Sequence, residues 1–219
     1  MNDIAGIILA AGASKRMGRL KQLLSVGEFN LIEVVLQEAL QSHLSSVILV
    51  LGHESGTIKR NIRPSLLDHQ KLKIIDNPGY KKGVSTSIII SLKMVEKEYD
   101  QVMFLLSDMP FLSASIINHL IKGYCDSGSD LCALKIKERR SLPVIVSRKY
   151  YPEIHRLKGD IGARDLFVKY ADEVALIEAP EGYQDFDLDT PEDYEEYLKR
   201  FTTSRRRLAL AGQGDTPVK

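Results

Sequence analysis

Short apolar runs alternate along this chain with longer stretches of helical periodicity, and this alternation constrains the fold more than any other feature. The runs are rich in aliphatic and β-branched residues, which predicts strands. Strands separated by whole helices need crossover connections and favour a mainly parallel sheet. We therefore expect a three-layer α/β domain with a Rossmann-like, mostly parallel sheet. The predicted strands cover residues 4–10, 46–51, 72–75, 101–106, 130–136 and 143–147.

The periodic stretches predict the helices. They cover residues 30–42, 84–99 and 113–124, and Ser113 is of a residue type that commonly caps a helix N-terminus. A further helix is expected within residues 162–174, followed by a strand at 175–179.

The C-terminal part has its own signals. Residues 185–189 predict a short strand, and the next helix begins with Thr190 as its cap and Pro191 at its first position. We expect one domain over residues 1–201 and a flexible tail over residues 202–219, where arginines cluster before Gly, Gln, Asp and Pro.

Charge and cysteine usage exclude several classes of partner. The chain has 30 basic and 29 acidic residues among 219, so no global field attracts nucleic acid or an anionic membrane. Its two cysteines, Cys125 and Cys132, do not form a C-x-x-C motif, and the N-terminal residues lack the pattern of a signal peptide. No apolar run approaches the length of about 18 residues that spans a bilayer. We expect a cytoplasmic protein that binds neither nucleic acid nor membrane.

The segment LAAGASKRMGRLKQLL directly follows the first predicted strand. Ligands of open parallel sheets bind beyond the carboxyl ends of the strands. A P-loop requires G-x-x-x-x-G-K-[ST], but Gly12 and Gly18 are separated by five residues and followed by arginine and leucine. A dinucleotide fingerprint requires G-x-G-x-x-G, and serine at position 14 breaks it. The segment is neither of these two motifs.

A longer glycine-containing turn remains, whose backbone N–H groups can face phosphate oxygens. Lys15, Arg16 and Lys21 add enough positive charge to neutralise a polyphosphate. A basic surface turn is the alternative, but the small residues at 10–12 argue against it, because close approach of backbone to a ligand needs small side chains. The segment therefore predicts a site for a nucleoside triphosphate.

Acidic residues offer candidates for a metal site. Asp108 follows the predicted strand at 101–106, and a carboxylate near phosphates is costly unless a divalent ion lies between them. Asp108 is thus the first candidate ligand; a turn or cap aspartate before Ser113 is the alternative. Asp187 and Asp189 alternate along a predicted strand and would share a face. For Asp189, support of the helix cap is an equal alternative.

Five segments together resemble one family. They are L-A-A-G-x-S-x-R-M-G-x-x-K-x-L-L near the N-terminus, then DNPGYKKGVSTSI, LLSDMPFL, LKGDIGARDLF and DFDLDTPEDY. In this order they are similar to motifs of the nucleotidyltransferases that complete the molybdenum cofactor, most closely its cytidylyltransferase branch. The resemblance spans roughly residues 6–200.

The resemblance implies transfer of CMP from CTP to molybdopterin, with release of pyrophosphate and use of Mg²⁺. It implies Asp187 as the second metal ligand beside Asp108, and catalytic roles for Arg16, Lys21 and Asp108. The residues that it places around the nucleotide are Leu9, Ala10, Ala11, Gly12, Ser14, Arg16, Lys21, Asn77, Gly83 and Ser87. Those that it places around the acceptor are Lys158, Gly159, Asp160, Gly162 and Arg164.

Two positions bear on specificity. Ala11 favours CTP, because the guanylyl branch of the family carries Ala-Gly-Gly. Ser141-Leu142-Pro143 departs from the family's Gly-His-Pro, so another phosphorylated acceptor is an alternative. Use of GTP is a further alternative, as is a non-catalytic carrier that hands finished cofactor to a molybdenum hydroxylase. The histidines lack metal-ligand spacing and are expected on the surface or on helix faces: His43, His53, His69, His119 and His155.

Overall fold

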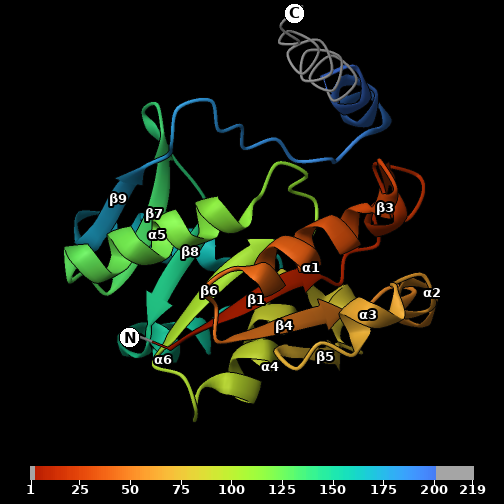
Figure 1. Cartoon of the computed structure of the whole chain (residues 1–219). Helices are drawn as coiled ribbons and strands as arrows, with labels where there is room; N and C mark the ends of the chain where they lie inside the picture. Colours follow the sequence, from red (N-terminus) through yellow and green to blue (C-terminus); the bar gives the residue numbers. More distant parts are fainter. Residues whose placement is uncertain (1–2, 201–219) are drawn as a thin grey trace, which may run out of the picture.

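The computed structural model describes residues 3–200, which form a sheet between two layers of helices (Figure 1). The sheet has seven strands in the order β5-β4-β1-β6-β8-β7-β9. Parallel pairing joins β1 to β4 and to β6, β4 to β5, and β7 to β9. The predicted fold class is confirmed. The strands are β1 (Ile4–Ala10), β4 (Ser46–Leu51), β5 (Leu72–Asp76), β6 (Gln101–Leu106), β7 (Leu131–Ile136), β8 (Arg139–Ser147) and β9 (Val174–Glu178).

Strand β8 is the exception to parallel pairing, since it runs antiparallel to both β6 and β7. A two-residue turn joins β7 to β8, and Lys137 in that turn has φ of 54°. A hairpin of this kind needs no crossover helix. The strand also begins at Arg139, earlier than the prediction at residue 143, because pairing with β7 extends to the turn.

The two helical layers follow from the alternation of side chains along the central strands. Ile4 and Ile8 of β1 pack in a core with α1 (Leu31–Gln41) and α5 (Ala114–Ser127), whereas Ala5 and Ile7 pack on the other face. That second face is covered by α4 (Val84–Val95), α6 (Tyr151–Ile154) and α7 (Ala163–Lys169). Burial on both faces explains the continuous apolar runs in the sequence.

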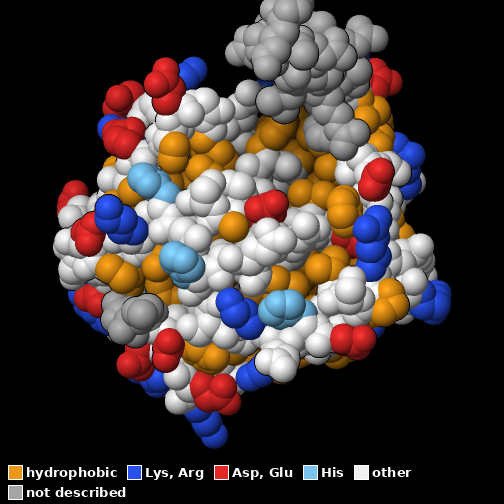
Figure 2. Space-filling model, in the orientation of Figure 1, with side chains coloured by type: hydrophobic (Ala, Val, Ile, Leu, Met, Phe, Trp, Pro, Cys, Tyr) orange, Lys and Arg blue, Asp and Glu red, His pale blue; other side chains and the backbone are white. Residues whose placement is uncertain are grey.

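Short elements complete the described chain. The helical ones are α2 (Ser55–Arg60), α3 (Pro64–Leu67), η1 (Lys21–Leu23), η2 (Tyr80–Lys82), η3 (Arg148–Tyr150) and η4 (Ala171–Glu173). A separate two-stranded sheet pairs β2 (Ser25–Val26) with β3 (Phe29–Asn30). Within residues 3–200, no helix is long and apolar enough to cross a bilayer. Acidic and basic side chains are interspersed over the face in Figure 2.

The predicted helix starts are confirmed. The Ser113 hydroxyl accepts a hydrogen bond from the Ile116 N–H, as an N-cap does. Residues 191–200 are helical, and the Thr190 hydroxyl accepts from the Asp193 N–H while the Asp193 carboxylate accepts from the Thr190 N–H. This reciprocal pair is a capping box. The predicted domain end at residue 201 and the tail at 202–219 lie outside the described residues.

The strand predicted at residues 185–189 is wrong. Residues 183–189 form no regular element; instead, the Leu188 N–H donates to the Asp108 carbonyl oxygen at 3.0 Å. Leu188 is fully buried in a third core cluster with Met17 and Tyr197. The segment is thus held in place by this hydrogen bond and by the buried Leu188 side chain rather than by strand pairing.

Strand order determines where a ligand can enter. The chain leaves β1 toward β4 on one side and leaves β6 toward β7 on the other. Loops that leave neighbouring parallel strands in opposite directions open a crevice at the carboxyl ends. The loops after β1 and β6 therefore border the candidate site.

Candidate functional site

The loop after β1 is a turn stabilised from inside by Gln22. Ser14 has φ of 51°, and its carbonyl oxygen accepts from Met17 and Gly18 N–H groups at 3.1 and 3.2 Å. The fully buried Gln22 amide donates to the carbonyl oxygens of Ala10 and Gly12 at 3.0 and 3.1 Å. This clamp fixes the path of the small-residue segment, and sequence reasoning missed it.

Two cations and two carboxylates meet beside this loop. The Lys21 ammonium pairs with Asp108 and, at 3.0 Å, with Asp189. The Arg16 guanidinium donates to the other carboxylate oxygen of Asp189 at 2.9 Å. Burial lowers the pKa of Lys21, but attraction to Asp108 and Asp189 outweighs it and raises the pKa above its usual value. Lys21 therefore stays charged.

The carboxylates of the cluster lack some of the hydrogen-bond and ion-pair partners that would stabilise their negative charge. Asp108 is 6% exposed, and its Oδ1 is buried with no hydrogen-bond partner in the described structure. Burial, followed by repulsion from Asp108 and Asp189, raises the pKa of Asp187 to about 7. Such carboxylates gain most from an added cation.

The donor set fits a hard divalent ion of the Mg²⁺ type, which takes one or two carboxylates and completes its octahedron with water and phosphate oxygens. Among residues 3–200, no group of three or more His, Cys, Asp or Glu side chains is arranged to hold a metal. A cation here would therefore depend on a ligand bound with it. Asp108 and Asp187 are the residues of this cluster that fit the role.

Two adjoining cavities flank the cluster. The first, here the loop cleft, has a volume of about 810 Å³ and is bordered by the 9–16 loop, Lys21 and Asp108. The second, here the hairpin pocket, has a volume of about 600 Å³ and is bordered by the β7–β8 hairpin, α7 and Asp187. Leu9, Val84 and Leu106 line both. The acidic cluster thus lies where the two cavities meet.

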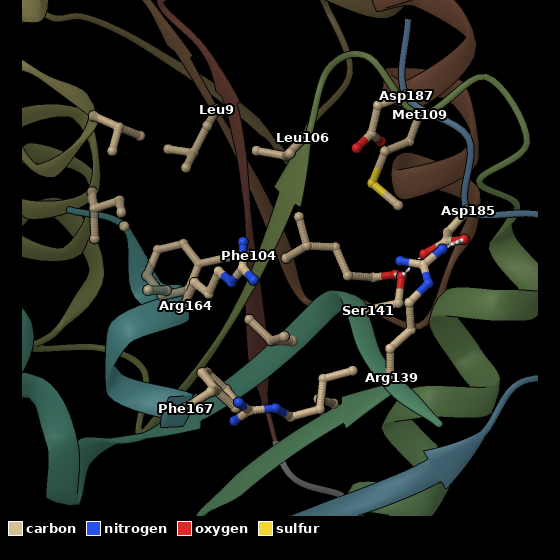
Figure 3. Close-up of a pocket in the computed structure, with 18 of the residues that line it drawn as sticks. Leu9, Phe104, Leu106, Met109, Arg139, Ser141, Arg164, Phe167, Asp185 and Asp187 are labelled. Atoms are coloured by element: carbon tan, nitrogen blue, oxygen red, sulfur yellow. Dashed lines mark hydrogen bonds and ion pairs between the residues drawn. The ribbon is translucent and has the colours of Figure 1, made fainter. Parts of the chain in front are cut away.

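The hairpin pocket has apolar walls with charged groups on them. Figure 3 shows Phe104, Phe167 and Arg164 on one side and Arg139, Ser141 and Asp185 on the other. The Ser141 hydroxyl donates to Asp185 at 2.6 Å, and Arg139 pairs with the same carboxylate. Serine at the position where the family usually has glycine thus orients an acidic side chain of this pocket.

Most of the predicted nucleotide residues line the loop cleft, including Arg16, Gly83 and Ser87. Asn77 does not line either cavity; its amide donates to Thr86 and Ser87 hydroxyls, both at 2.9 Å, and supports the start of α4. Ser87 is thus positioned by Asn77. The residues predicted around the nucleotide that do line the cleft are Leu9, Ala10, Ala11, Gly12, Ser14, Arg16, Lys21, Gly83 and Ser87.

The predicted acceptor residues divide between the cavities. Gly162 and Arg164 line the hairpin pocket, Asp160 lines the loop cleft, and Lys158 lines neither. The Asp160 carboxylate accepts from the Val84 N–H at 3.3 Å. Asp160 therefore caps α4 from a distant loop.

At Gly83, the segment before α4 comes into close contact with the loop that contains Gly159. The φ of Gly83 is 109°, and a Cβ built on it would lie 2.1 Å from the carbonyl carbon of Gly159. The Gly159 carbonyl oxygen accepts from the Ser85 N–H at 3.1 Å. No side chain fits at position 83 while the two loops are in this contact.

His53, one of the histidines expected on the surface or on helix faces, is half-buried just after β4. His53 lines the loop cleft with Tyr80, and its Nδ1 lies 3.1 Å from the Tyr80 hydroxyl oxygen. A single histidine has no spacing signal, but this one follows β4, whose last residue pairs with Ala10 of β1. Its place just after a strand was the available clue.

A crevice beyond the carboxyl ends of parallel strands, with two cations paired to carboxylates at its border, is typical of an α/β nucleotide-binding domain of the nucleotidyltransferase type. The comparison with protein families agrees. The model of the MobA-like NTP transferase domain matches residues 6–174, and the chain belongs to this family of nucleotidyltransferases.

Relatives and solved structures extend the likeness over nearly the whole chain. Purine catabolism protein PucB of Bacillus subtilis (strain 168) is 28% identical over 198 residues, which cover 88% of this chain and 94% of PucB. Molybdenum cofactor cytidylyltransferase of Escherichia coli (strain K12) is 31% identical over 120 residues, which cover 55% of this chain and 59% of the relative. The crystal structure of a homologue of Mycobacterium tuberculosis Rv0371c, from Mycobacterium sp. strain JC1, superposes with a TM-score of 0.78 at 27% identity, covering 91% and 97% of the two chains. The resemblance inferred from the five motifs is confirmed at the level of the family.

Proposed function

We propose that this protein transfers CMP from CTP to a molybdopterin-type acceptor, releases pyrophosphate and requires Mg²⁺. The observation that carries the proposal is the junction of the two cavities, where Lys21, Asp108 and Asp187 lie between a cleft sized for a nucleotide and a pocket sized for an acceptor. The E. coli relative named as a cytidylyltransferase of the molybdenum cofactor supports the choice of donor and acceptor.

In this reaction an acceptor phosphate oxygen attacks the α-phosphorus of CTP in line, and the bond to the pyrophosphate oxygen breaks. Arg16 and Lys21 bind the phosphates and neutralise charge that spreads in the transition state. The N–H groups of the loop, whose path Gln22 fixes, face the same phosphates. Positioning and charge supply the catalysis.

Asp108 and Asp187 would hold Mg²⁺, which would supply positive charge to stabilise the reacting phosphates. The buried, unpartnered Oδ1 of Asp108 and the raised pKa of Asp187 both support this assignment. Arg164, with Phe104 and Phe167, offers the acceptor a cation and aromatic faces in the hairpin pocket.

The test measures pyrophosphate release by the purified protein with each of the four NTPs, Mg²⁺ and molybdopterin with or without molybdenum. We expect release with CTP and an acceptor only. Release with GTP alone among the nucleotides would replace the donor, and no release in any mixture would overturn the enzymatic proposal. If Asp108→Asn left the activity of a molybdenum hydroxylase intact in cells, the carrier role would be favoured instead.

A second acceptor class is favoured by the contact between Ser141 and Asp185. Ser141 and Leu142 stand where the family motif has glycine and histidine, so this wall lacks the imidazole, and the Ser141 hydroxyl pairs with the Asp185 carboxylate at 2.6 Å. A phosphorylated compound other than molybdopterin is therefore the second candidate acceptor. The same assay, run with other phosphorylated heterocycles in place of molybdopterin, separates the two acceptors.

A further inference from the structure

We infer that the Asp189 carboxylate stands in for a phosphate group: in the nucleotide-free protein it occupies both phosphate-binding cations, and it must release them when phosphates enter. Asp189 is therefore a positioning residue that competes with substrate. The inference rests on the proposed binding of phosphates by Arg16 and Lys21 and adds a competitor to it.

The contacts carry the first step. One carboxylate oxygen of Asp189 accepts from the Lys21 ammonium at 3.0 Å and the other from the Arg16 guanidinium at 2.9 Å. The two oxygens of one carboxylate thus join the two cations, as two oxygens of one phosphate group do. Arg16 and Lys21 lie five positions apart in the sequence, and Asp189 holds them at one point.

Charge gives the second step. Arg16 and Lys21 are both paired with carboxylates, of Asp189 and Asp108, so neither cation is free before a ligand binds. A triphosphate that enters the loop cleft brings several negative charges to the same two cations. Without a divalent ion between them, Asp189 and the phosphates would repel one another at short range, so the carboxylate must leave the two cations.

Exposure and backbone anchoring indicate which of the two carboxylates can leave the cations. The Asp108 side chain is 9% exposed and follows β6, whereas the Asp189 side chain is 33% exposed and lies on the irregular segment at residues 183–189. The Asp189 N–H donates to the Asp193 carboxylate, so the main chain is anchored to the helix cap while the side chain can rotate. Asp189 can leave the cations without unfolding the segment.

The experiment measures binding of inorganic pyrophosphate without divalent metal, by titration calorimetry, to the full-length protein and to Asp189→Asn. We expect the variant to bind about fivefold more tightly, since asparagine keeps the shape but removes the competing charge, and partly exposed pairs of this kind are worth up to about 1 kcal/mol. Glu192→Gln is the matched control, because it removes the same charge from an exposed side chain three residues away and should leave the affinity unchanged.

Equal or weaker binding by Asp189→Asn would overturn the inference, because a merely structural aspartate gives one of those results. A second measurement guards against a poorly folded variant. Without anions, Asp189→Asn loses the ion pair with Arg16 and one of the two carboxylates on Lys21, so its Tm should fall, and pyrophosphate should raise its Tm more than that of the wild type. Asp189→Ser should behave in the same way.

The outcome is independent of the chemistry proposed for the site. Tighter pyrophosphate binding by Asp189→Asn, together with no turnover of CTP, would support the inference and overturn the proposed reaction. Turnover of CTP without a gain in pyrophosphate affinity would do the reverse.

Discussion

The main-chain N–H of Leu188 donates to the carbonyl oxygen of Asp108 at 3.0 Å, which joins the last segment of the domain to the loop after β6. The two residues are far apart in sequence, and their side chains lie in different environments. Leu188 packs in the core with Met17, while Asp108 pairs with Lys21. The contact brings Asp187 and Asp189 to the site without any strand pairing.

Replacement of Asp108 by asparagine tests the acidic half of the site. The amide keeps the size of the side chain but cannot bind a cation as a carboxylate does, so pyrophosphate release with CTP and acceptor should fall about a hundredfold or more. Asp126→Asn, on an exposed helix position, is the matched control and should retain full activity. Unchanged turnover in Asp108→Asn would remove Asp108 from the site.

Replacement of Gln22 by alanine tests the clamp inside the loop. The carbonyl oxygens of Ala10, which is buried, and of Gly12 lose this donor, so the free energy of unfolding should fall by roughly 1–3 kcal/mol. The KM for CTP should rise more than kcat falls, because the loop loses its set path. Denaturant titration and steady-state kinetics measure the two effects. Gln41→Ala, at an exposed position of α1, should change neither.

Replacement of Gly83 by alanine tests the contact between the loops. Alanine must adopt a φ of 109° and would overlap the Gly159 carbonyl, so the variant should lose about 1–3 kcal/mol of stability or separate the loops. Gly56→Ala in α2 is the control, since a Cβ there lies 3.5 Å from its nearest neighbour and favours helix. Equal Tm values for the two variants would contradict the role of Gly83.

Titration of Asp187 should make stability depend on pH. Its pKa is raised from 3.8 to about 7 in the folded protein, so between roughly pH 4 and pH 7 the folded chain keeps a proton that the unfolded chain releases. The free energy of unfolding without divalent metal should therefore fall as pH rises through this window, and Asp187→Asn should flatten the fall. Urea titrations at pH 5 and pH 8 measure it. Parallel profiles for both proteins would show that Asp187 is ionised throughout.

The central strands were readable from the sequence because burial on both faces leaves continuous apolar runs. The predicted limits of β1, β4 and β6 coincide with those observed. Strand β8 was placed too late because its first half carries polar residues that face the hairpin pocket, among them Arg139 and Ser141. The prediction of a strand at residues 185–189 was wrong because the apolar and acidic residues alternate there without any strand pairing. The buried Leu188 side chain packs in a core cluster instead.

Candidate residues were predictable where a residue type and a strand end coincide, as with Asp108. The contacts of Gln22 and His53 were missed because they join segments distant in the sequence. A buried amide that holds two carbonyl groups looks in the sequence like any polar residue on a helix. His53 gains its place only when β4 lies beside β1.

The tight turn between β7 and β8 has a consequence for how such proteins can diversify. Residues 137–138 form the tip of a finger that walls the hairpin pocket, and this tip is remote from the ladders that join β1 to β4 and β6. A longer turn, or other side chains in it, would change the shape of the hairpin pocket while the loop cleft keeps its shape. Substitutions in this turn can thus alter the hairpin pocket and leave the loop cleft unchanged.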